Sequence, residues 1–233
     1  MSLTRERTDQ ILRGDLNPEY MEAALKSLAW GYDRLYQELA DNNAINDAMR
    51  HEQFGHRRGT CAIDALLENA KKHGVPYDIR RLDCNGQNKL LVRMGRLVLM
   101  QEPVLSFRDD PRVSDFKLKL ANLYGLMNQL ELDLGDGYYR DSEWAGCILS
   151  VLLHGAAGPK FTRDHKKLGG VMLAVPDAEY SSWVHRLDLY ELAMHGRNGK
   201  DWTPKSAPSE YSLLQPDNVI INPKRKNSKR SER

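Results

Sequence analysis

Cysteine is scarce in this chain: its 233 residues include three, Cys61, Cys84 and Cys147, and no C-x-x-C pair. Thiols this few and this far apart provide neither a disulfide framework nor a structural zinc site. The sequence therefore predicts a protein of a reducing compartment, and we expect it in the cytoplasm with no metal or other cofactor.

Long hydrophobic runs are absent as well. The longest apolar run, residues 148–153, is much shorter than the roughly 20 residues that a membrane-spanning helix requires. Residues 1–9 contain Arg5 and Arg7 but no apolar stretch follows them, so a secretory signal is not predicted. Hydrophobic residues nevertheless make up 41% of the chain, which is enough for a buried core, and no membrane partner is predicted.

Motifs of the common enzyme classes are missing, since the sequence contains no G-x-S-x-G, H-E-x-x-H or G-x-G-x-x-G. Residues 155–162 include two glycines and a lysine, but their spacing differs from that of a phosphate-binding loop, and Pro159 lacks an amide donor. His154, Asp164 and His165 have no compact ligand spacing, so a metal site is not predicted there.

The charge of the chain is nearly balanced, +2 at pH 7, yet its last ten residues are strongly basic. They contain six Lys or Arg, one Glu and no apolar side chain. A segment that cannot bury surface is predicted to be disordered and to act through its charge. Because the natural partner of such a tail is nucleic acid, we expect phosphate contacts from its basic residues. These are Lys224, Arg225, Lys226, Lys229, Arg230 and Arg233.

Two further basic clusters precede the tail. One lies in a Gly- and Lys-rich stretch, residues 154–170, which is predicted to be a loop and to supply further nucleic-acid contacts. Its candidate residues are Lys160, Arg163, Lys166 and Lys167. The other cluster is interpreted as solvated protein surface, and it consists of His51, His56, Arg57 and Arg58. Three clusters on a nearly neutral chain favour a polyanion partner.

Helical periodicity dominates the N-terminal part. Asn17-Pro18 predicts the start of a helix that runs to about Ala40, with Asn17 as its N-cap. Residues 44–54 predict a short polar helix, and residues 60–73 another, capped by Thr60 and stopped by Gly74.

Strand patterns follow over residues 77–82, 89–94 and 97–104, the last two joined by a hairpin turn at Gly95-Arg96. After them the sequence predicts a helix from Asp110 to about Leu134 with Leu123 on its buried face, a strand over 144–153 and a strand over 171–175. A last helix is predicted from Asp177 to about Met194, closed by Gly196.

Helices that alternate with short strands predict an α+β protein with one mixed sheet of about five strands packed by helices. The predicted organisation is an N-terminal helical extension over residues 1–56, an α+β core domain over 57–197, and a Pro-interrupted linker with the basic tail over 198–233.

Three functions remain open at this stage. The leading hypothesis is a nucleic-acid-associated protein without catalytic activity. The order helix–strand–strand–strand–helix–strand also resembles the PD-(D/E)xK nuclease core, where Asp83, Glu102 and Glu68 could bind Mg²⁺. The catalytic Lys is absent from its expected place, and Lys89 would have to substitute for it. A winged-helix arrangement is disfavoured because acidic residues lie on its candidate recognition helix. The third function is a protein-interaction or inhibitor-type module.

Overall fold

The second helix begins where the sequence predicts its cap, whereas the first helix was not predicted. A computed structural model describes residues 5–82, 86–105, 107–124, 144 and 147–189. Helix α1 spans Arg5–Asp15 and α2 spans Pro18–Ala40. Asn17 is the N-cap of α2, and its side-chain oxygen accepts a hydrogen bond from the Tyr20 amide at 3.0 Å. The predicted start of this helix is therefore confirmed.

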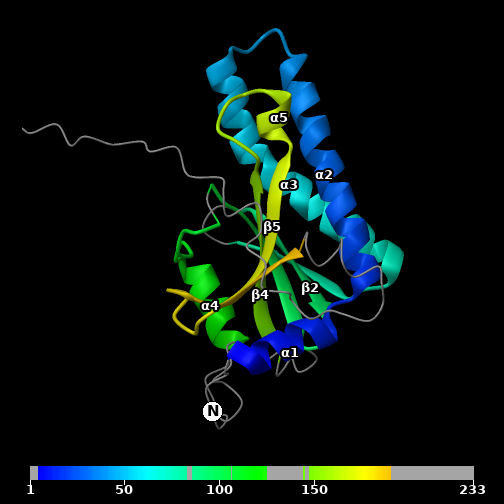
Figure 1. Ribbon diagram of the computed structural model, residues 1–233, viewed down its shortest axis with the longest axis vertical. Helices are drawn as coiled ribbons and strands as arrows, with labels where there is room; N and C mark the ends of the chain where they lie inside the picture. Colours follow the sequence, from blue (N-terminus) through cyan, green and yellow to red (C-terminus); the bar gives the residue numbers. More distant parts are fainter. Residues whose placement is uncertain (1–4, 83–85, 106, 125–143, 145–146, 190–233) are drawn as a thin grey trace, which may run out of the picture. The chain divides into compact units, whose positions relative to one another are not determined.

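Helix α3 is one helix, Asp47–His73, where the sequence predicts two. Asn46 caps its start, Gly74 ends it in the left-handed conformation with φ of 64°, and Thr60 lies inside it. Phe54, Ala62 and Leu66 form a single buried stripe that packs against α2, beside which α3 lies in Figure 1. Burial of that stripe outweighs the low helix propensity of the glycines between the two predicted halves.

Six strands form one mixed sheet in the order β1-β2-β3-β4-β5-β6. Strands β3 and β4 are parallel, whereas every other neighbouring pair is antiparallel. The α+β class and the single mixed sheet are therefore confirmed, with one strand more than predicted. The strands are β1 Tyr77–Arg81, β2 Asn88–Met94, β3 Leu97–Pro103, β4 Ile148–Ala156, β5 Leu168–Pro176 and β6 Trp183–Asp188.

The predicted loop over residues 154–170 is shorter than expected, because both of its ends belong to the strands of a β-hairpin. Strand β4 continues to Ala156, the short helix α5 spans Arg163–Lys166, and β5 begins at Leu168. Its glycines are needed for close approach: a Cβ on Gly169 would lie 2.4 Å from the Ala157 Cα, and one on Gly155 would lie 2.9 Å from the Val104 carbonyl oxygen. Glycines that suggest a flexible loop thus allow two backbones to pack closely.

The helix predicted after Asp177 is wrong, because residues 183–188 form strand β6. The Asp177 carboxylate accepts hydrogen bonds from Ser181 and Ser182, which closes a turn directly after β5. Antiparallel pairing of Val175 with His185 then places the following residues in the sheet. The remainder of the predicted helix, residues 190–194, lies outside the described residues.

Helices cover both faces of the sheet (Figure 1). Helices α1, α2 and α3 pack on one face, over residues such as Leu99 and Leu173. Helix α4, Asp115–Leu123, packs on the other face through Leu120, which is 2% exposed, while Leu123 is only half-buried. Strands β4 and β5 are neighbours and are covered on both faces, as predicted. The predicted boundary at residues 56/57 falls within α3, and the predicted helix beyond Tyr124 lies outside the described residues.

Replacing Asn17 by Ala is expected to lower the free energy of unfolding by about 1 kcal/mol, because the Tyr20 amide loses its acceptor at the start of α2. Chemical denaturation of the two proteins measures this difference. Asn88→Ala, at the exposed start of β2, is the matched control, and an equal loss in both variants would contradict the capping role.

Candidate functional site

The basic residues of the β4–β5 hairpin, predicted as nucleic-acid contacts, have different surroundings. Arg163 donates to both carboxylate oxygens of Asp33 on α2, at 3.0 and 3.2 Å. Lys167 lies 3.6 Å from the Asp164 carboxylate, and Lys160 is exposed. Two of these three exposed cations are therefore paired with an acid on the protein surface.

Lys166, the fourth candidate in this hairpin, points inward and is 3% exposed. Its Nζ donates to the carbonyl oxygens of Pro159 at 3.1 Å and Gly158 at 3.4 Å, and lies 5.5 Å from the centre of the Phe54 ring on α3. Two carbonyl dipoles and an aromatic ring therefore surround this ammonium group. Among the described residues, Lys166 forms no ion pair with a carboxylate.

Arg58 lies one helical turn after Phe54 and is also buried, with 8% of its surface exposed. Its Nε atom has no solvent contact and no hydrogen-bond acceptor within the part of the chain that the structure describes. The preceding residue, Arg57, points outward instead and pairs with Glu38 at 2.8 Å. A buried guanidinium group without an acidic partner costs stability, so Arg58 calls for an explanation.

Positive charges dominate the field around these two residues. Burial and then the charge of Arg58 lower the pKa of Lys166 to about 8. Burial, followed by Lys166 and Arg58, also lowers the pKa of the exposed His51 on α3. Among the described residues, the charges that shift the pKa values of Lys166 and His51 are positive. The buried cationic cluster, which we define as Arg58 and Lys166, has the exposed His51 beside it and the electrostatic character of an anion site.

His154 is fully buried on β4, behind this cluster. The Tyr32 hydroxyl donates to its Nδ1 at 2.6 Å, and its Nε2 lies 2.8 Å from Oε1 of Gln101 on β3. Burial and then Arg58 lower the pKa of His154 to about 3, so its ring is neutral and carries its proton on Nε2. Both ring nitrogens are occupied, and a metal ligand role for His154 is not supported.

The acidic residue of the nuclease hypothesis, Glu102, is engaged at both oxygens. Lys117 of α4 forms an ion pair with its Oε1, and the Tyr180 hydroxyl donates to its Oε2 at 2.9 Å. Tyr180 is itself fully buried and has a positive φ of 52°, which is uncommon for a residue with a side chain. Glu102 therefore holds α4 and the β5–β6 turn on the sheet.

Of the other nuclease positions that the structure describes, Lys89 lies near Glu102 and Glu68 does not. Lys89 belongs to β2, and burial, followed by Lys117, lowers the pKa of Lys89. Glu68 lies on α3, on the opposite face of the sheet, and Asp83 falls outside the described residues. Among the described residues, no group of three or more His, Cys, Asp or Glu could hold a metal ion.

The described cysteines are not activated nucleophiles. Cys61 and Cys147 are free thiols, and burial raises the pKa of both. Cys84 lies outside the described residues.

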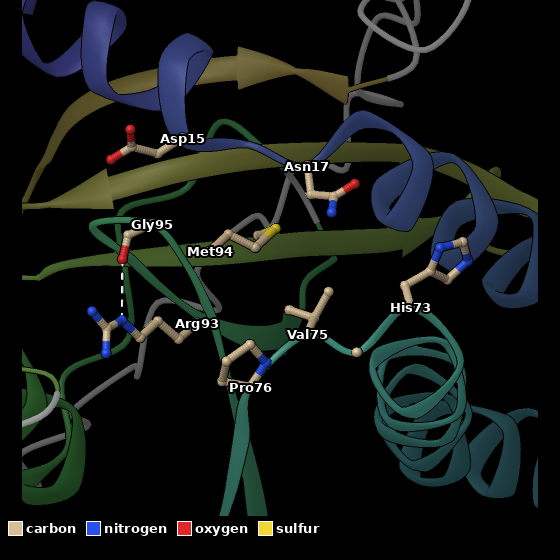
Figure 2. A pocket seen from close by; sticks show the side chains of 9 residues that line it. Asp15, Asn17, His73, Val75, Pro76, Arg93, Met94 and Gly95 are labelled. Atoms are coloured by element: carbon tan, nitrogen blue, oxygen red, sulfur yellow. Dashed lines mark hydrogen bonds between the residues drawn. The ribbon is translucent and has the colours of Figure 1, made fainter.

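A hollow of about 290 Å³ lies where the α1–α2 link, the end of α3 and the β2–β3 turn meet (Figure 2). Its charged groups are used within the protein: Arg96 donates to both carboxylate oxygens of Asp15, at 2.6 and 3.1 Å, and Arg93 donates to the Gly95 carbonyl at 3.1 Å. We therefore assign this hollow a structural role.

Sequence reasoning placed Arg58 on a solvated surface and Lys166 in a loop, although it singled out both clusters. Their proximity depends on the β4–β5 hairpin folding back against α3, which no local pattern encodes. Arg58 follows Phe54 by four residues and therefore lies on the same face of the helix, whereas Arg57 is rotated from it by about 100°. This spacing is the signal that could have identified Arg58 as the inward residue.

Comparisons with protein-family models, with curated proteins and with solved structures found no match. None of the helices in the described residues has the length and apolar character that crossing a membrane requires.

Proposed function

We propose that this protein associates with nucleic acid in the cytoplasm and has no catalytic activity. The observation that carries the proposal is the basic tail, residues 224–233, whose members lie outside the described residues. With six Lys or Arg and one Glu, the tail has a formal charge of +5, whereas the whole chain has +2. The rest of the chain therefore has a formal charge of −3, and the excess positive charge is concentrated at one end.

This distribution favours a polyanion as the partner of the tail. An acidic body and a cationic tail give attraction to phosphates that depends on the tail and weakens steeply with salt. In the described part, Lys160 adds an exposed cation, and the buried cationic cluster adds uncompensated positive charge. The occupied oxygens of Glu102 make the non-catalytic form of the proposal the better supported one.

Removing residues 224–233 is expected to weaken binding to DNA and RNA and to flatten its salt dependence. Each lost phosphate contact reduces the slope of log K against log salt by about 0.9 on duplexes and about 0.7 on single strands. Loss of all six contacts would therefore reduce the slope by about 5 on duplexes and by about 4 on single strands. Fluorescence anisotropy with labelled oligonucleotides at several salt concentrations measures both quantities.

Two tail variants of full length serve as controls. A tail with its six Lys and Arg replaced by Gln should behave like the truncated protein, while a tail of shuffled order should bind like the original, since its number of positive charges is unchanged. Equal affinities and slopes for intact and truncated chains would overturn the proposal and favour a protein-interaction module. Magnesium-dependent cleavage of the oligonucleotide would favour a nuclease.

A further inference from the structure

The buried cationic cluster is built by two elements, helix α3 and the short helix α5. His51, Phe54 and Arg58 share one face of α3, since they follow one another at intervals of three and four residues. Opposite them, Lys166 extends from α5 at the tip of the β4–β5 hairpin, which packs against α2 (Figure 1). The Lys166 Nζ lies 5.5 Å from the centre of the Phe54 ring, so the hairpin tip and α3 approach each other at this point.

Donors in this cluster outnumber acceptors. Lys166 has two backbone carbonyls for its three N–H groups, and the Nε of Arg58 is sealed from solvent with no acceptor among the described residues. Nearby acids are engaged elsewhere: Glu38 pairs with Arg57 and Asp47 pairs with Arg50.

A guanidinium fork beside an ammonium group matches an anion with several oxygens. Arg presents paired, planar donors suited to two oxygens of one anion, and Lys adds a compact point charge. A carboxylate fits the fork, but a phosphate group offers a further oxygen and a second negative charge to Lys166. His51 at the exposed side can add a third cation when it is protonated.

We propose that Arg58 and Lys166 form a binding site for a single phosphate group, with His51 at its entrance. The site shares its ligand chemistry with the proposed function but does not depend on the tail or on nucleic acid. The phosphate can come from free inorganic phosphate or from the terminal phosphate of an oligonucleotide, and the two sources are separated experimentally.

The first test uses the full chain and inorganic phosphate, with sodium chloride at equal ionic strength as reference. Phosphate should raise the midpoint of thermal unfolding in a concentration-dependent manner, as any ligand of the native state does. Arg58→Met should remove this rise. It should also raise the midpoint without phosphate by about 2–4 °C, because an uncompensated buried charge is replaced by an apolar side chain of similar length.

Lys166→Met gives a second, independent variant, for which isothermal titration should show at least about a tenfold loss of phosphate affinity. Arg57→Met is the matched control, since this neighbouring arginine is exposed and paired, and it should keep the full response to phosphate. The proposal is overturned if phosphate acts equally on the original chain and on Arg58→Met or Lys166→Met.

The source of the phosphate is distinguished with the chain truncated after residue 223. This protein should retain the response to inorganic phosphate even if the tail proposal fails. A short oligonucleotide with a 5′-phosphate that competes with inorganic phosphate, while its dephosphorylated form does not, would identify a nucleic-acid end as the occupant. No competition from either form would identify the free anion, whereas equal competition from both would contradict a site for a single terminal phosphate.

Discussion

Replacing Glu102 by Ala is expected to lower the free energy of unfolding by about 3 kcal/mol. The substitution leaves the Lys117 ammonium and the Tyr180 hydroxyl without their shared acceptor, in surroundings where the Lys117 side chain is 15% exposed. Removing one partner of a buried ion pair is strongly destabilising because the remaining charge is uncompensated. Denaturant titration followed by circular dichroism measures the loss.

Further variants assign this loss to the unpaired charge. Glu102→Gln retains an acceptor for Tyr180 and should cost less, and adding Lys117→Met to it should recover most of the stability, because no buried charge is left alone. Glu52→Ala removes an exposed carboxylate of α3 and should leave stability unchanged. A fully stable Glu102→Ala protein would show that this carboxylate does not hold α4 and the β5–β6 turn, and would revive its candidacy as a ligand.

The second large effect is an acid sensitivity that depends on His154. Its pKa of about 3 in the folded protein lies well below the ordinary value of 6.5, so between these pH values the unfolded chain binds a proton that the folded chain does not. The free energy of unfolding should therefore fall with decreasing pH by about 1.4 kcal/mol per unit from this residue alone. By pH 4 the contribution amounts to about 3 kcal/mol.

Comparison of two substitutions isolates this contribution from that of the carboxylates. His154→Gln can retain hydrogen bonds to Tyr32 and Gln101 but cannot titrate, so its stability should decline less steeply between pH 6.5 and pH 4. His56→Gln, in which an exposed side chain is changed, should keep the slope of the original protein. Parallel slopes for the His154→Gln protein and the original chain would show that His154 is protonated in the folded state.

Local signals in the sequence predicted local structure well. The Gly95-Arg96 turn joins β2 and β3 as predicted, with Gly95 at a positive φ of 54°, and Asn17 and Gly74 cap their helices. The predictions that were wrong concern segments whose structure depends on residues far away in the sequence. Gly155 and Gly169 permit a close hairpin, which their composition cannot distinguish from a loop.

The candidate sites likewise differ in whether a local stretch of sequence is enough to reveal them. The basic tail is visible in the sequence because it is contiguous, whereas the cationic cluster joins residues more than a hundred positions apart. Arg58 and Lys166 gain their significance from burial and from the lack of an acidic neighbour, two properties that only the folded chain has. The pairing of Glu102 with Lys117 and Tyr180 likewise links three elements, which explains why an acidic strand residue resembles a catalytic one before its partners are known.

The parallel pairing of β3 with β4 divides the sheet into two antiparallel meanders, each closed by connections within its own half of the sheet. Leu97 pairs with Ile148, so the β3–β4 pairing brings together the ends of a chain segment of about fifty residues. The conformational entropy lost in closing this segment costs about 2 kcal/mol more than closing a five-residue turn. The helical layer covers strands on both sides of the β3–β4 pairing. Helix α3 contacts β2 and β3, α2 contacts β5, and α1 contacts both β3 and β6. Helices α1, α2 and α3 thus contact both halves of the sheet, which no hairpin turn of the sheet connects to each other.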